Sequence, residues 1–169
     1  MNKEIIVYTS GTWDLFHVGH LNILEKSAKL GDKLIVGVST DELIMDYKGI
    51  PPIIPFEQRF KIIESIKWVY KAVKQEILTE IRQLKELNVD IVTIGDDWKN
   101  KYLEGLEWIK KQPRKKVVYI PYTGQISTTS IKRNIIKNSY EIIFSELSRE
   151  VEHMEEWKKK QAQEKKRNN

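Results

Sequence analysis

Short apolar runs rich in β-branched residues alternate along this chain with segments in which apolar residues recur every three or four positions. Runs of the first kind are typical of buried strands, and the periodic segments are typical of amphipathic helices. The runs predict five strands, at residues 5–8, 34–38, 69–73, 91–94 and 117–120, and the periodic segments predict helices at 21–30, 55–66, 77–87, 101–110 and 127–136. The alternation predicts an α/β fold, a doubly wound parallel five-stranded sheet with helices on both faces.

The pattern changes near the end of the chain. Apolar residues from position 140 onward follow alternating steps of four and three, at Tyr140, Phe144, Leu147, Val151 and Met154. This spacing predicts a C-terminal amphipathic helix, which runs into a lysine-rich tail. We therefore divide the chain into a domain at residues 1–138 and a C-terminal helix and basic tail at 139–169. The apolar face of this helix needs the domain, a second subunit or a membrane surface as its partner, and the interspersed glutamates favour protein over an anionic bilayer.

Composition narrows the function classes. The 169 residues contain no cysteine, which excludes disulfides, thiolate zinc sites and cysteine nucleophiles. The first residues, MNKEIIVYTS, carry no signal-peptide pattern, and no apolar run approaches the roughly 20 residues that span a bilayer, so we expect a cytoplasmic protein without stable membrane insertion. The net charge of +5 comes from scattered lysines and from the tail. It favours an anionic small-molecule substrate and a solvated tail over nucleic-acid binding.

The candidate chemistry begins in GTWDLFHVGH, residues 11–20, directly after the first predicted strand. Ligands of parallel sheets bind at the carboxyl ends of the strands, where loops lead into helices. His17 and His20 are three residues apart, which brings both imidazoles toward the same side of a helix that begins near Val18. The free N–H groups of a first helical turn attract anions, and Gly19 lets a phosphate approach the backbone. The pair therefore predicts a phosphate site.

Two other interpretations of the histidines stay open. One histidine can cap the helix while the other is merely exposed. The pair can also hold zinc, but zinc needs three or four protein ligands and the third histidine, His153, lies in the charged C-terminal segment. We rank both below phosphate binding and predict no protein metal site.

Two further motifs follow predicted strands. The hydroxyl run from Ser127 to Ser130 comes after the last strand, so it caps a helix, offers hydroxyls and N–H groups to phosphate, or does both. Asp96 and Asp97 end the fourth strand, where aspartates form turns or line a ligand site. Both motifs are expected at the same edge of the sheet as the histidines.

These motifs form an ordered set across residues 5–135. The set comprises GTWDLFHVGHLNILEKSAKLGDKLIVGVSTDE, PFEQRFKIIESIKWV, IGDDW and GQISTTSIK. It resembles the HxGH nucleotidyltransferase superfamily, which is Rossmann-like, and within it the cytidylyltransferase branch, with the glycerol-3-phosphate enzymes as the nearest group. The resemblance implies an enzyme that joins CTP and a phosphorylated small alcohol into a CDP-alcohol and releases pyrophosphate.

The resemblance also implies roles for individual residues. The catalytic residues it implies are His17, His20, Lys48 in a loop at 46–52, and Arg59 on the next helix, where a guanidinium suits phosphate oxygens or a carboxylate. The nucleotide-binding residues it implies are Gly11, Thr12, Trp13, His17, His20, Gly95, Asp96, Asp97, Tyr122, Thr123, Ile126, Ser127, Thr128 and Thr129. The residues it implies for the acceptor are Asp14, Lys48 and Lys67. It further implies Mg²⁺ bound mainly through the CTP triphosphate, and a homodimer.

The chain departs from the pattern of the glycerol-3-phosphate enzymes at several positions. Trp13 stands for phenylalanine, Lys67 and Tyr122 each stand for arginine, and Gly124-Gln125 stand for glutamate and glycine. The two lost guanidinium groups leave phosphoethanolamine and phosphocholine open as acceptors beside glycerol 3-phosphate, because a tyrosine face suits their cation. An adenylyltransferase acting on another phosphate or carboxylate acceptor, and a nucleotide sensor without catalysis, stay open as alternatives.

Overall fold

Five parallel strands form one sheet in the computed structural model, which describes residues 3–124 and 126–167. The strands are β1 (Ile6–Gly11), β2 (Lys33–Ser39), β3 (Lys71–Gln75), β4 (Ile91–Gly95) and β5 (Lys116–Ile120). Their order is β3-β2-β1-β4-β5, and every pairing is parallel, which confirms the predicted strands and the doubly wound topology. The chain order reverses between β1 and β4. Loops that follow these two strands therefore diverge at the point where such sheets bind ligands.

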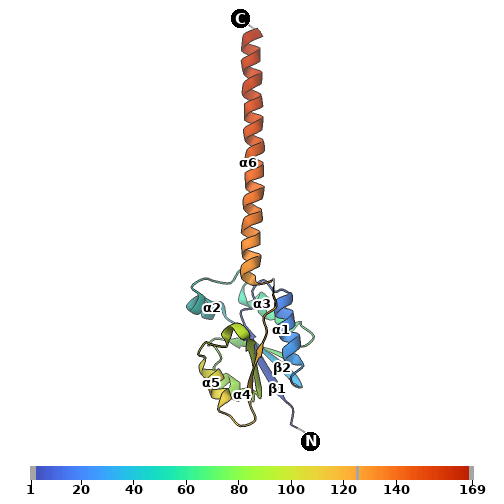
Figure 1. Cartoon of the computed structure of the whole chain (residues 1–169), viewed down its shortest axis with the longest axis vertical. Helices are drawn as coiled ribbons and strands as arrows, with labels where there is room; N and C mark the ends of the chain where they lie inside the picture. Colours follow the sequence, from blue (N-terminus) through green and yellow to red (C-terminus); the bar gives the residue numbers. More distant parts are fainter. Residues whose placement is uncertain (1–2, 125, 168–169) are drawn as a thin grey trace. The chain divides into compact units, whose positions relative to one another are not determined.

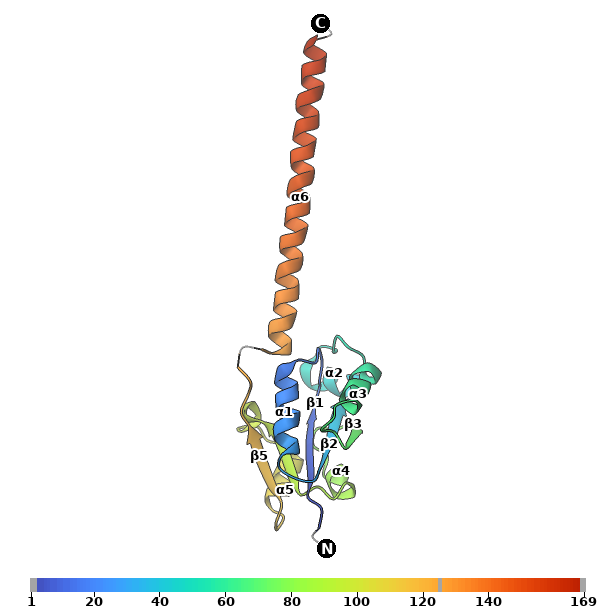
Figure 2. The ribbon, with the colours of Figure 1, turned by 90° about the vertical axis from the view of Figure 1, so that its right-hand side faces the viewer.

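Helices cover both faces of the sheet, as predicted (Figure 1). On one face, α1 (Val18–Ala28) and α3 (Phe56–Glu64) contribute Leu24 and Ile63 to a core with β1 and β2. On the other, α4 (Ile81–Glu86) and α5 (Glu104–Lys110) contribute Leu84 and Ile109. The short 3₁₀ helix η1 (Asp96–Trp98) follows β4. Figure 2 shows α1 running alongside β1, so its first turn lies at the carboxyl end of that strand.

One helix, α2 (Asp41–Lys48), was not expected from the sequence pattern. Its eight residues are too few for a clear 3.6-residue period, but its ends carry strong signals. Thr40 caps the N-terminus, where its Oγ1 accepts the N–H of Leu43, and Gly49 ends the helix in the left-handed conformation at φ 70°. Lys48 is consequently the last residue of a helix, and the prediction of a loop at this position was wrong.

The helices expected at 127–136 and from 140 onward are one continuous helix, α6 (Thr128–Arg167). No glycine or proline interrupts this stretch of sequence, so nothing stops the first periodic segment before the second begins. The chain divides into two compact units, Met1–Thr128 and Thr129–Asn169, and this division falls ten residues before the predicted boundary at 138. Among the described residues, no helix has the length and apolarity needed to cross a membrane.

Candidate nucleotide-binding site

His17 is the N-cap of α1. Its Nδ1 accepts the backbone N–H of Gly19 at 3.1 Å, which satisfies one of the free donors of the first helical turn. A Cβ on Gly19 would lie only 2.8 Å from the His17 ring, so the glycine makes room for the cap. The interpretation of one histidine as a cap is confirmed for His17, but His20 is half-buried rather than merely exposed.

The cap determines which ring nitrogen of His17 carries the hydrogen in the neutral form. Because Nδ1 accepts a hydrogen bond, a neutral ring carries its hydrogen on Nε2. Within the described part of the chain, His17 Nε2 and His20 Nδ1 are buried side-chain nitrogens without a hydrogen-bond partner. Leaving such a group unpaired costs about 1–3 kcal/mol, so these two nitrogens are available to hydrogen-bond a polar ligand.

Burial keeps both imidazoles neutral at pH 7. It lowers the pKa of His17. Burial and then the neighbouring His17 lower the pKa of His20 to about 3, which outweighs the opposing effect of Asp14, and Lys48 adds the smallest contribution. The ring edge of Trp13 meets His20 with centroids 5.4 Å apart, which adds to its desolvation. Neutral imidazoles present N–H donors without the cost of burying two charges.

The loop between β1 and α1 is conformationally strained. Trp13 and Leu15 have φ values of 56° and 47°, a region that non-glycine residues rarely adopt. Trp13 is held there by a hydrogen bond from Nε1 to the Gly37 carbonyl at 2.9 Å, and its ring is buried in the core. A Cβ on Gly11 would lie 3.1 Å from that ring. The buried Trp13 ring therefore fixes the conformation of this loop on its core side, where it also contacts the ring of His20.

Lys48 reaches this loop from the last turn of α2. Its Nζ donates to Thr12 Oγ1 at 2.8 Å, and the Tyr47 hydroxyl lies 2.9 Å from the same oxygen. The structure thus brings together Lys48 and Thr12, two of the site residues that the resemblance implied. Sequence reasoning missed Tyr47, because nothing in its spacing distinguishes it from a surface tyrosine.

Asp14 anchors the segment that follows α2. Its carboxylate accepts the N–H of Ile53 at 3.1 Å and that of Ile54 at 2.9 Å, and the residue is only 2% exposed. These contacts give Asp14 a positioning role within the chain, whereas the sequence implied contact with the acceptor.

Arg59 is fully buried on α3 and ties three segments together. Its guanidinium donates to the carbonyls of Ile54 and Thr12 and forms an ion pair of 2.5 Å with Asp41 at the start of α2. Of the two partners considered for this residue, the structure therefore provides the carboxylate. Arg59 positions the loop after β1 rather than presenting its charge to a ligand.

The segment after β5 is tied to the same edge of the sheet. Asp96 Oδ1 accepts the N–H of Tyr122 at 3.1 Å, and Thr123 Oγ1 accepts a hydrogen bond from Asn22 Nδ2 on α1 at 3.1 Å. A Cβ on Gly95 would lie 2.4 Å from an oxygen of Asp97, so that carboxylate folds back over the end of β4. Sequence reasoning missed Asn22, although it lies on α1 only two residues beyond His20.

The ISTT segment continues this connection. A Cβ on Gly19 would lie 3.6 Å from Ile126, which places this isoleucine beside the first turn of α1. Thr128 Oγ1 donates to the carbonyl of Asp14 at 2.9 Å, and Ser127 precedes it. Thr129 belongs to the second compact unit, and Gln125 lies outside the described residues.

The loops after β1, β4 and β5 thus meet around two neutral imidazoles at the amino end of a helix, the site at which α/β proteins bind nucleotide phosphates. A family model described as "Cytidylyltransferase-like" matches residues 8–134. The chain belongs to the cytidylyltransferase-like family.

Two curated relatives in this family are 37% identical to the chain. Glycerol-3-phosphate cytidylyltransferase of Bacillus subtilis (strain 168) aligns over 134 residues, 79% of this chain and 97% of the relative. Ethanolamine-phosphate cytidylyltransferase of Dictyostelium discoideum aligns over 136 residues, 76% of this chain but 36% of the relative.

Solved structures agree with this cytidylyltransferase-like fold. The lipopolysaccharide core biosynthesis protein of Thermoplasma volcanium GSS1 matches with a TM-score of 0.57 and 28% identity over 72% of this chain and 98% of that protein. A putative nicotinate-nucleotide adenylyltransferase of Vibrio parahaemolyticus shares the fold, with a TM-score of 0.55 and 16% identity over 80% of this chain and 89% of that one.

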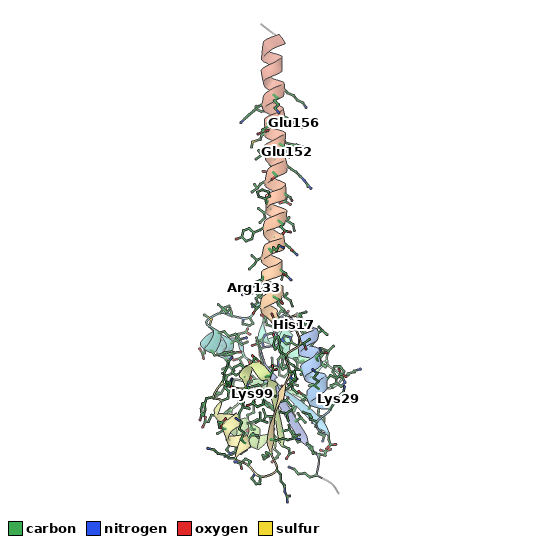
Figure 3. All side chains as sticks on the ribbon, in the orientation of Figure 1. His17, Lys29, Lys99, Arg133, Glu152 and Glu156 are labelled. Carbon is green, nitrogen blue, oxygen red and sulfur yellow. The ribbon has the colours of Figure 1, made fainter. Side chains whose placement is uncertain are left out.

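One residue that the family resemblance implied is not at this cytidylyltransferase-like site within a single chain. Lys67 follows α3 and precedes β3, which begins at Lys71, so it lies toward the amino ends of the strands. Its Nζ lies 4.9 Å from the ring centroid of Trp68, and its charge acts on Glu25 in the second half of α1. The helix reverses the chain direction, and this carries Lys67 to the edge opposite the histidines. Figure 3 labels His17 at the start of α1 and Lys29 just beyond its end.

Proposed function

We propose that the protein is a cytidylyltransferase that transfers CMP from CTP to a phosphorylated small alcohol, forming a CDP-alcohol and pyrophosphate. The observation that carries the proposal is the pair of unpartnered buried nitrogens, His17 Nε2 and His20 Nδ1, at the amino end of α1. The names of the two curated relatives, one acting on glycerol 3-phosphate and one on ethanolamine phosphate, support the acceptor class.

The reaction needs no protein nucleophile. A phosphate oxygen of the acceptor attacks the α-phosphorus of CTP, the bond from that phosphorus to the bridging oxygen breaks, and pyrophosphate leaves opposite the attack. His17 donates from Nε2 to a triphosphate oxygen. Lys48 Nζ leaves Thr12 Oγ1 and donates instead to a phosphate oxygen, on which negative charge develops in the transition state. Asp14 and Arg59 hold the loop that aligns these donors, so geometry is set before substrates bind.

Mg²⁺ enters this proposal as part of the substrate. Within the described part of the chain, no group of three or more histidine or acidic side chains is placed to hold a metal ion. Asp14 already accepts two backbone N–H groups and Asp96 accepts another, so few carboxylate oxygens remain for a cation. The triphosphate would supply most of the ligands of Mg²⁺, and the enzyme would bind the magnesium complex of CTP.

The acceptor alcohol depends on the segment after β5. Tyr122 is 51% exposed there, so an aromatic face is available where an arginine was expected. A tyrosine attracts the cation of phosphoethanolamine or phosphocholine, and the neutral glycerol group gains nothing from it. A homodimer and a cytoplasmic location complete the proposal.

Pyrophosphate release tests this function. The intact protein is given Mg²⁺ with CTP or ATP and, in turn, glycerol 3-phosphate, phosphoethanolamine or phosphocholine, with His20→Ala as the matched inactive control. We expect release with CTP and at least one acceptor, and little with ATP, because groups that hydrogen-bond the cytosine edge would be left unpaired by adenine. Faster turnover with ATP would establish an adenylyltransferase. CTP binding without release under any condition would indicate a sensor.

A further inference from the structure

Eight apolar side chains form a continuous stripe along α6. They are Ile136, Tyr140, Ile143, Phe144, Leu147, Val151, Met154 and Trp157, and each is at least half exposed. We call this set the apolar stripe. Solvated single apolar residues are ordinary on protein surfaces, but a contiguous stripe on one face of a helix requires a partner.

The stripe follows a heptad repeat. Phe144 and Val151 take position a, and Tyr140, Leu147 and Met154 take position d, with unbroken steps of four and three. Ile136, Ile143 and Trp157 at position g widen the same face. Glu152 and Glu156, labelled on α6 in Figure 3, take positions b and f on the opposite face. This face is charged in the C-terminal half of the stripe, whereas Ile135 and Ile142 are exposed on it in the N-terminal half. A helix with such an apolar stripe is suited to pack against another helix of similar pattern.

We propose that the apolar stripe pairs with the same stripe of a second copy of this chain, with the two α6 helices antiparallel. Eight side chains on each helix, each at least half exposed, offer apolar surface on the scale of the roughly 1,000 Å² that a specific interface needs. This inference makes α6 the dimer contact of the proposed homodimer, and it does not depend on which nucleotide the enzyme uses.

The flanking charges select the orientation. In a parallel pair in register, Lys137 and Lys158 at position a would each face their own copy, and Glu150 at position g would face Glu155 at position e. The two helices would therefore repel where the glutamates meet, in the C-terminal half of the stripe, and at both of its ends.

An antiparallel register avoids most of this repulsion. With Phe144 opposite Leu147 of the second copy and Tyr140 opposite Val151, the flanking pairs are Ile136 with Trp157, Ile143 with Glu150, Glu141 with Ser148, and Asn134 with Glu155. Lys137 then faces Met154 beside Glu155. The only like-charged contact among these positions, Lys158 with Arg133, falls at the outer ends, where solvent screens it as it would screen the lysine pairs of the parallel register. The repulsion between Glu150 and Glu155 is therefore what separates the two orientations.

The alternative occupant is a lipid surface, and the charges disfavour it. Glu150 and Glu155 border the apolar stripe on its two sides, where they would face the headgroups of an anionic bilayer. Against a second copy in the antiparallel register the same glutamates meet apolar or neutral side chains and open solvent.

Single cysteines test the orientation, because the chain has none of its own. Tyr140→Cys and Val151→Cys are prepared separately, one with a mass tag, then mixed and oxidised under mild conditions. We expect a disulfide that joins the two different variants. We expect little cross-linking of either variant alone, because the two copies of the same cysteine would lie about 16 Å apart along the helix axis. Ser145→Cys at position b is the matched control and should cross-link with neither variant.

Mass and activity complete the experiment. Phe144→Glu with Leu147→Glu should reduce the light-scattering mass or the cross-linking yield at least several-fold, whereas Ser145→Glu should leave both unchanged. Pyrophosphate release by the glutamate variants should persist, so a failure of the pairing remains separate from a failure of the proposed function. Disulfides within each single-cysteine variant, absence of the mixed disulfide, or binding of the intact protein to anionic vesicles through the stripe would overturn the proposal.

Discussion

The imidazole of His17 stacks on that of His20, with ring centroids 3.9 Å apart and ring planes 22° from parallel. Two imidazolium rings at this separation would repel, and His17 adds to the burial that lowers the pKa of His20. The stacked pair therefore carries two buried nitrogens without a hydrogen-bond partner, one on each ring. The site is arranged before the substrate arrives, which is how a preorganised phosphate site lowers the barrier of a transfer reaction.

Removing either ring should lower turnover. His17→Ala and His20→Ala are expected to reduce kcat by about 10²–10³, the range for loss of one transition-state donor. His17→Ala also removes a helix cap, at a cost of about 0.5–2 kcal/mol of stability. His17→Asn separates the two roles, because asparagine caps a helix but does not reach the position of Nε2. Pyrophosphate release measures kcat, and recovery of full turnover in His17→Asn would leave His17 with a capping role only.

The His20 environment also predicts a pH dependence of stability. The pKa of His20 is about 3 in the folded chain, whereas an unfolded histidine titrates near 6.5, so the unfolded state binds more protons between these values. The free energy of unfolding should therefore be fully retained above about pH 6.5 and fall as the pH drops below it, by up to about 1.4 kcal/mol per pH unit.

Urea unfolding between about pH 5 and pH 7 measures this effect. His20→Gln should show a shallower decline than the wild type, because glutamine does not titrate. His153→Gln, which replaces an exposed histidine on α6, is the matched control and should follow the wild-type curve. If the His20→Gln and wild-type curves run parallel over this range, the buried neutral state of His20 is wrong.

The sheet could be predicted from the sequence because buried parallel strands are short, apolar and β-branched, and each of the five predicted runs overlaps one strand, with offsets of one or two residues at β1 and β3. The histidine pair could be predicted because its position after β1 follows from that topology. Contacts formed by residues distant in sequence could not. Arg59 and Asp41 are 18 residues apart in the sequence, and Asn22 and Thr123 are 101 residues apart. Contacts at such separations have no counterpart in the local spacing of apolar and polar residues. The α2 helix was missed because its signals lie in its caps and not in its period.

The bond from Asn22 to Thr123 should affect nucleotide binding more than chemistry. Asn22→Ala removes the donor that ties the segment after β5 to α1, and a net contribution of about 0.5–1.5 kcal/mol corresponds to a rise in the KM for CTP of roughly 2- to 10-fold with kcat little changed. Thr123→Val should have a similar effect, and the double variant should be no worse than either single one. Lys26→Ala, at an exposed position of the same helix, is the control. Additive losses in the double variant would show that the two residues act separately.

Shortening the chain should separate catalysis from assembly. The catalytic groups proposed above lie before Thr129, so a chain that ends at Lys160 should keep full activity. It should also keep the mass of the dimer, because it retains the whole apolar stripe. A chain that ends at Ser139 loses all of the stripe except Ile136, and with it the surface that the antiparallel pairing needs. Its mass by light scattering should fall to that of a monomer, while His17, His20 and Lys48 still support pyrophosphate release.

The melting temperature gives a second measurement on the same two chains. The stripe is at least half exposed in the isolated chain, so its removal should lower the melting temperature only through the lost subunit contact. The melting temperature of the intact protein should therefore depend on protein concentration, and that of the shorter chain should not. An unchanged mass for the shorter chain would mean that another surface joins the subunits, and a melting temperature that falls equally at every concentration would mean that α6 stabilises its own chain.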